Sequence, residues 1–159
     1  MINNVFIGHA GLILGEGEDA FLYDPAGTYE GCEEKECRGS VQSFRGSGDF
    51  FEYPEFDWDS YLKFHLDDGE DIVLIEFIVP RSQMEHMRDN VLYYSDTADN
   101  FYCASNVARV LRESGGVFNN IPDEFFAPWG LKKHLLNIQS QKGVVPHVFI
   151  TMPPHRPFQ

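Results

Sequence analysis

Cys103 is the residue whose setting most clearly suggests chemistry. Apolar residues follow it at the i+4, i+7 and i+8 positions of a helical pattern: Val107, Val110 and Leu111. Asp99 or Asn100 is suited to cap the start of this helix, and Gly115-Gly116 predicts its end. The thiol is therefore expected in the first turn, where unpaired backbone N–H groups and the helix dipole favour the thiolate, the form that attacks carbonyl carbons. The same N–H groups, including that of Cys103, are natural donors for an oxyanion hole.

His9 is the candidate base for this nucleophile. A reactive cysteine needs a base within hydrogen-bond reach and a third group that orients the base. His9 stands within residues 5–14, a run that is otherwise apolar or glycine and is typical of a strand buried on both faces. A buried imidazole needs partners for both ring nitrogens, and a cysteine on one side with a carboxylate on the other would supply them. His147, in a strand-like segment near the C-terminus, is the rival base.

Asp24 is the candidate orienting group. Residues 19–24 are predicted to form the second strand of a hairpin with the strand that carries His9. If the loop consists of the four residues 15–18, His9 lies opposite Asp24, and directly paired side chains share a face of the sheet. The carboxylate can then accept a hydrogen bond from the imidazole. A loop longer by one residue would instead bring a neighbour of Asp24 opposite the histidine.

Each of these residues also has an ordinary structural interpretation. Cys103 can be a small buried residue on a core face, His9 a core histidine bonded to a backbone carbonyl, and Asp24 a turn residue before a proline. From spacing alone, this interpretation is the commoner one for an isolated cysteine or histidine. Three other histidines are expected at the surface or in helix packing: His65, His86 and His134.

The other two cysteines, Cys32 and Cys37, form a C-x4-C pair in an acidic stretch. They can bridge in an oxidising compartment or remain free thiols. A structural zinc site needs about four ligands, and no second CxxC or HxxxH pair accompanies these two cysteines. We therefore expect no metal site and no cofactor, and Cys103 is the odd cysteine in either case.

The elements that must position these residues have an α+β pattern. Strands are predicted at residues 5–14, 19–24, 71–79 and 144–150. Helices are predicted at 58–66, 82–91 and 128–138 around the Cys103 helix, with a helical turn at 122–126. Ser82 and Glu85 have the spacing of a capping box at the start of a helix. We expect one domain, residues 1–159, in which an antiparallel sheet packs against helices and the irregular, aromatic-rich residues 28–60 form an insertion.

Composition excludes several classes of partner. The chain has 159 residues, of which 43% are hydrophobic and 14% aromatic, enough for a sizeable core. Its formal charge of −13 repels nucleic acid and anionic membrane surfaces and is compatible with a basic protein partner. No apolar run approaches the roughly 18–20 residues that span a bilayer, and the N-terminus lacks the pattern of a signal peptide. We therefore expect synthesis in the cytoplasm and no membrane insertion.

The order of the motifs resembles that of the circularly permuted papain-like peptidases, a group that includes the NlpC-like cell-wall amidases. The resemblance rests on GHAGLILG at residues 8–15, FLYD at residues 21–24 and a late cysteine that opens a helix. The segment from Tyr102-Cys103-Ala104 to Val110-Leu111, followed by Gly115-Gly116 and Asn120-Ile121-Pro122, is similar to toxin members of this group. Some of those are type VI secretion effectors that cleave peptidoglycan peptides. The resemblance covers residues 5–27 and 99–137, and the turn between the two strands is longer here than is usual in the group.

This resemblance implies a cysteine amidase or endopeptidase with Cys103 as nucleophile, His9 as base and Asp24 as the orienting residue. Tyr102 would be the tyrosine often found beside the cysteine. The implied substrate is a peptidoglycan peptide, reached in the periplasm of a target cell through a specialised secretion system, and the implied partners are a secretion carrier and a cognate immunity protein. Two alternatives remain. One is a papain-like toxin that acts on a protein substrate as a protease, deamidase or acyltransferase. The other is a non-catalytic acidic binding or immunity module with a buried Cys103.

Overall fold

The computed structural model describes residues 2–3, 8–25, 29, 50–53, 55–68, 72–94, 102–125, 127–141 and 148–151. In these residues the chain is α+β, as predicted. The strands are β1 (Ile2–Asn3), β2 (His9–Ala10), β3 (Leu12–Leu14), β4 (Phe21–Tyr23), β5 (Phe50–Glu52), β6 (Ile72–Ile75) and β7 (Val148–Thr151). The α-helices are α1 (Trp58–Asp68), α2 (Arg81–Tyr94), α3 (Cys103–Ser114) and α4 (Pro128–Gln141). The paired strands are antiparallel and form two sheets, in the orders β2-β1-β6-β7 and β3-β4-β5.

The predicted first strand is divided at Gly11 between the two sheets. Its first part, β2, pairs with β1, and its second part, β3, pairs with β4. In the β3–β4 pair Leu14 lies opposite Phe21, so the loop is longer than the four residues expected, and it contains a short 3₁₀ turn, Gly17–Asp19. The predicted pairing of His9 opposite Asp24 is therefore wrong. The β3–β4 register is shifted by two residues, which keeps the same side chains on each face of that pair, and His9 itself pairs with Asn3 of β1 in the other sheet.

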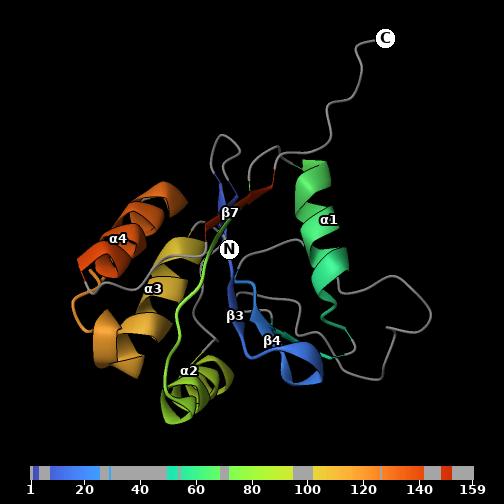
Figure 1. Cartoon of the computed structure of the whole chain (residues 1–159). Helices are drawn as coiled ribbons and strands as arrows, with labels where there is room; N and C mark the ends of the chain where they lie inside the picture. The colour runs from blue at the N-terminus through green and yellow to red at the C-terminus, as the bar shows by residue number, and fades with distance from the viewer. Residues whose placement is uncertain are drawn as a thin grey trace.

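Strand β4 separates two hydrophobic cores. Phe21 and Tyr23 belong to a larger core, whereas Leu22 points into a second core, as expected from the alternation of side chains along a strand. The larger core includes residues of α2, α3 and α4. The second, which we call the aromatic core, contains Ala20, Leu22, Tyr29, Phe51, Phe56 and Tyr61. Figure 1 shows the corresponding arrangement, with α2, α3 and α4 on one side of β3 and β4 and α1 on the other.

Helix α3 begins at the candidate nucleophile itself. The backbone N–H of Asn106 donates to the carbonyl oxygen of Tyr102 at 2.9 Å, which makes Tyr102 the N-cap residue in place of the predicted Asp99 or Asn100. Those two residues lie outside the described part of the chain. The predicted end of the helix is confirmed, because Gly115 has a φ of +82°, a conformation that favours glycine.

Two predictions about the neighbouring segments are wrong. Helix α2 begins at Arg81, so Ser82 is not its cap; instead Glu85 accepts a hydrogen bond from the Arg81 guanidinium at 2.9 Å. The start of the predicted helical turn at 122–126 is not helical. It is tied to α3 by Arg112, which donates to the Pro122 carbonyl at 3.3 Å and pairs with Asp123 at 2.7 Å.

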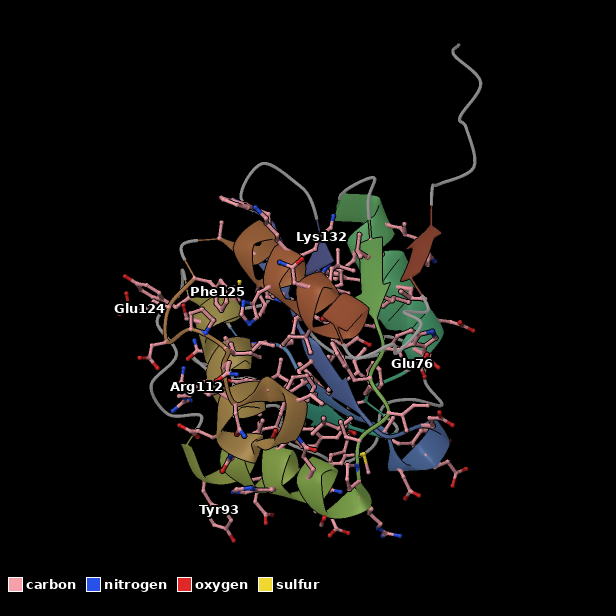
Figure 2. All side chains as sticks on the ribbon, turned by 60° about the vertical axis from the view of Figure 1, so that its left-hand side comes forward. Glu76, Tyr93, Arg112, Glu124, Phe125 and Lys132 are labelled. Atoms are coloured by element: carbon pink, nitrogen blue, oxygen red, sulfur yellow. The ribbon has the colours of Figure 1, made fainter. Side chains whose placement is uncertain are left out.

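Figure 2 shows Arg112 and Phe125 on the flank where α3 and α4 meet.

The helices predicted at 58–66 and 128–138 are confirmed by α1 and α4, and the strand predicted at 71–79 is confirmed as the shorter β6. The strand predicted at 144–150 is confirmed in part by β7, and residues 144–147 lie outside the described residues. None of the described helices is long and apolar enough to cross a membrane.

Alanine at Gly15 is expected to destabilise the fold more than alanine at Gly17. Both glycines have positive φ, +77° and +58°, so each substitution carries a backbone penalty of about 1–2 kcal/mol. A Cβ at Gly15 would in addition lie 2.9 Å from the carbonyl oxygen of Asp19, whereas a Cβ at Gly17 would meet nothing within 4 Å. Chemical denaturation of the two variants gives the comparison. Equal losses in the free energy of unfolding would contradict the tight loop.

Candidate active site

The structure brings the three predicted residues together. His9 lies on β2 and Asp24 directly follows β4, and the His9 Nε2 atom is 2.6 Å from the Asp24 Oδ1 atom. The side chain of Cys103, the first residue of α3, lies close enough to His9 to raise the pKa of the imidazole through hydrogen bonding and charge. Because Nε2 is engaged by the carboxylate, the other ring nitrogen is left for the sulfur. Asp24 is fully buried and Cys103 is 8% exposed, so these contacts are shielded from bulk water.

The charges of the three groups stabilise one another. Burial lowers the pKa of His9, but the hydrogen bonds and negative charges of Asp24 and Cys103 outweigh this effect and raise it to about 10. Burial would raise the pKa of the Cys103 thiol, yet the hydrogen bond and positive charge of His9 hold that pKa below its usual value. The pKa of Asp24 is likewise low, because the His9 contact overcomes the cost of burial. The resting site is therefore an imidazolium between a carboxylate and a thiolate.

Backbone N–H groups add to the stabilisation of the sulfur. Hydrogen bonds from the backbone of Ala10 and Ala104 lower the pKa of the Cys103 thiol. Tyr102, the N-cap residue of α3, makes no side-chain hydrogen bond to the helix, so its own side chain does not take up the N–H groups of the first turn. These donors and the positive end of the helix dipole favour a negative charge at this position, as predicted for the helix start.

Two further residues, Tyr61 and His65, complete the site from helix α1. The Tyr61 hydroxyl donates to the same Asp24 Oδ1 atom at 2.6 Å. The His65 ring lies parallel to the His9 ring, with centroids 5.6 Å apart and an interplanar angle of 8°. Sequence reasoning did not single out Tyr61, and it placed His65 at the surface, which is wrong because His65 is only 4% exposed. The signal that could have found them is their i, i+4 spacing beside Phe64, which gives α1 an aromatic face.

Gly11 makes room for this arrangement. A Cβ at this position would lie 2.6 Å from the Tyr61 hydroxyl oxygen and 3.2 Å from Asp24 Oδ1. Any larger residue would therefore push the hydroxyl or the carboxylate away. The break between β2 and β3 thus lies where the aromatic core meets the candidate site.

The remaining predicted residues lie elsewhere or outside the described residues. His86 is exposed, as expected. His134, which lies in α4, packs edge-on against Phe125, also as expected. Tyr102 is 51% exposed beside the cysteine. The rival base and the C-x4-C pair lie outside the described part of the chain: His147, Cys32 and Cys37. Among the residues that the structure describes, no group of three or more His, Cys, Asp or Glu side chains is arranged to hold a metal ion.

A cavity of about 770 Å³ lies next to the site. Its walls come largely from β3, from residues 73–77 and Val79 and from apolar side chains of the helices, and they include Ala10, Val107 and Leu111. Val107 and Leu111 follow Cys103 by one and two turns of α3, so the cavity lies along the helix face that also carries the sulfur. The three predicted site residues do not themselves line it.

No family model matches this chain, and comparisons with curated proteins and with solved structures find no match.

The alkylation rate of Cys103 is expected to reach half of its maximum at a pH below that of a free thiol, roughly 8.5. Iodoacetamide reacts with the thiolate, and the lowered pKa of Cys103 keeps that form populated at a lower pH than in a free thiol. In His9→Ala the burial effect remains without the imidazolium, so the midpoint should rise above the wild-type value. Mass spectrometry of the Cys103 peptide separates this reaction from labelling of the other cysteines. A wild-type midpoint at or above that of a free thiol would contradict the ion pair.

Proposed function

We propose that the protein is a cysteine amidase or endopeptidase that cleaves peptide bonds of bacterial peptidoglycan, and that it has a permuted papain-like fold. The observation that carries this proposal is the chain of contacts from Asp24 through His9 to Cys103, with the sulfur at the first position of a helix. The order of the three residues, with the histidine strand before the cysteine helix, is that of the permuted group. An ion pair of thiolate and imidazolium is the arrangement that cysteine hydrolases use.

The proposed reaction has two steps. In the first, the Cys103 thiolate attacks the carbonyl carbon of the scissile amide, and the oxygen of the tetrahedral intermediate accepts hydrogen bonds from N–H groups at the start of α3. The His9 imidazolium gives its proton to the leaving amine as the C–N bond breaks, which leaves a thioester. In the second, neutral His9 takes a proton from water, and the resulting hydroxide displaces the sulfur to release the carboxylic acid and restore the ion pair. Asp24 keeps the imidazole oriented throughout.

The choice of peptidoglycan as substrate rests on the resemblance to the cell-wall amidases and their toxin members. As an antibacterial effector, the protein would be exported by a specialised secretion system and would act in the periplasm of a target cell. The producing cell would then need a cognate immunity protein. The formal charge of −13 favours a basic surface on such a partner.

The wild-type protein is expected to change the muropeptide profile of purified sacculi, and Cys103→Ala is expected to leave the profile as it is in untreated sacculi. Removal of the sulfur removes the nucleophile, so the loss should be at least about 10³-fold. Liquid chromatography with mass spectrometry identifies the released peptides and the bond cleaved. His86→Ala, which removes an exposed histidine that takes no part in these contacts, is the matched control and should behave as the wild type.

Identical profiles for the wild type and Cys103→Ala would contradict the amidase proposal. Should Cys103 still be strongly reactive towards iodoacetamide in that case, the alternative of a toxin that acts on a protein substrate would be favoured. Expression of the protein in the cytoplasm and, separately, in the periplasm then separates the two, because a protein-directed toxin would be harmful from the cytoplasm.

The hydrolytic activity is expected to be high between the lowered pKa of Cys103 and a pKa of about 10 for His9. Below this range the thiolate becomes protonated and loses its nucleophilicity. Above it the imidazolium loses the proton that the leaving amine requires. A profile of kcat/KM against pH measures both limits. A basic limit near the ordinary histidine pKa of about 6.5 would contradict the stabilisation of the imidazolium by Asp24.

A further inference from the structure

We propose that helix α1 supplies two positioning residues for this reaction: Tyr61, which fixes the Asp24 carboxylate, and His65, which fixes the plane of the His9 ring. Helix α1 would then be part of the working site and not only a cover for the small sheet. The kinetic part of this inference rests on the proposed hydrolysis. The predicted effect of Tyr61 and His65 on the reactivity of Cys103 does not rest on the proposed hydrolysis, because thiol alkylation needs no substrate.

The case for Tyr61 begins with the hydrogen bonds of Asp24. One oxygen, Oδ1, is 2.6 Å from both the His9 Nε2 atom and the Tyr61 hydroxyl. The other oxygen, Oδ2, is buried and has no hydrogen-bond partner among the described residues. The fully buried carboxylate therefore depends on two donors, and loss of the hydroxyl would leave only the imidazole to hold it. Burial and the nearby carboxylate raise the pKa of Tyr61 well above its usual value, so it remains a donor.

The Tyr61 ring is itself fixed by its surroundings. It is fully buried, and it meets three other rings edge-on: Tyr29 at 4.9 Å, Phe56 at 5.8 Å and His65 at 4.6 Å between centroids. On the far side Gly11 leaves just enough space for the hydroxyl. The donor therefore reaches Asp24 from a rigid position, which is what orientation of a reacting pair requires.

The case for His65 rests on the geometry of stacked rings. Its ring lies parallel to the His9 ring, with centroids 5.6 Å apart and an interplanar angle of 8°, and Tyr61 and Phe64 meet His65 edge-on. An imidazole turns about its Cβ–Cγ bond, and a flat neighbour on one face opposes this rotation. Rotation of His9 would break its contacts with Asp24 and Cys103 together.

Conservative variants distinguish positioning from ordinary packing in the aromatic core. Tyr61→Phe keeps the ring and removes only the hydroxyl. Tyr29→Phe is its matched control, because Tyr29 is also buried in the aromatic core but its hydroxyl donates to the Glu55 carbonyl and not to Asp24. His65→Phe keeps a flat ring over His9, whereas His65→Leu keeps apolar volume without a flat surface. Thermal unfolding of each variant shows that it is folded at the assay temperature.

The experiment measures kcat and KM on soluble peptidoglycan fragments, and the pH midpoint of Cys103 alkylation by iodoacetamide, for all four variants. Tyr61→Phe and His65→Leu should lower kcat by about 10- to 100-fold with KM within about twofold, since binding groups are untouched. Both should also raise the alkylation midpoint, because a displaced imidazolium stabilises the thiolate less. Tyr29→Phe should stay close to the wild type, and His65→Phe, which keeps a flat ring over His9, should lose less than His65→Leu.

Equal behaviour of Tyr61→Phe and Tyr29→Phe would overturn the role of Tyr61, and a wild-type midpoint in His65→Leu would overturn that of His65. If the wild type cleaves no peptidoglycan, the proposed function is contradicted. The alkylation midpoints of the variants still test whether Tyr61 and His65 position the ion pair. A rise in KM with unchanged kcat would assign these residues to substrate binding and would also overturn the proposal.

Discussion

The buried carboxylate of Asp24 is the constraint on which the rest of the site depends. A fully buried negative charge is costly unless it is paired and hydrogen-bonded, and here an imidazolium and a phenol both donate to one of its oxygens. The imidazolium can persist in a buried place because the carboxylate is there, and the thiolate can persist because the imidazolium is there. Burial alone would neutralise all three groups. Their alternation of charge over a short distance keeps them ionised together.

The backbone is arranged around this line of charges. Asp24 follows Leu22 by two positions, so it shares the face of β4 that points towards α1, and His9 has the same parity along its own segment as Gly11 and Ile13. The sulfur, by contrast, comes from α3, which packs on the larger core. The candidate site thus lies where the larger core and the aromatic core meet. Figure 1 makes the separation visible, with α1 and α3 on opposite sides of the strands that carry the base and its partner.

The sequence predicted the local parts of this arrangement well and the long-range parts poorly. The amphipathic pattern after Cys103 and the glycines after Ser114 were sufficient to place the thiol in a first helical turn. The contact of His9 with Asp24 survived an error in loop length, because a shift of two residues keeps the same side chains on each face of the β3–β4 pair. Tyr61 and His65 were missed for a different reason. Their helix is recognisable from local sequence, but which face of the hairpin it covers depends on the packing of residues far away in the chain, and no local pattern encodes that.

For the proposed hydrolase, the division of the structure into two cores has a consequence for how the activity can be switched off. An inhibitor of a one-core hydrolase must usually occupy the cleft or unfold the whole domain. In this chain the candidate nucleophile packs in the larger core, whereas Tyr61, which holds the orienting carboxylate, packs in the aromatic core. Cooperative units of a protein open with different free energies of unfolding. Partial unfolding of the aromatic core would leave the larger core intact, with the sulfur of Cys103 on α3, but the proton donor His9 would no longer be held in place. Activity and overall foldedness would then be lost at different temperatures, and a neutralising partner could act from the side remote from the thiol.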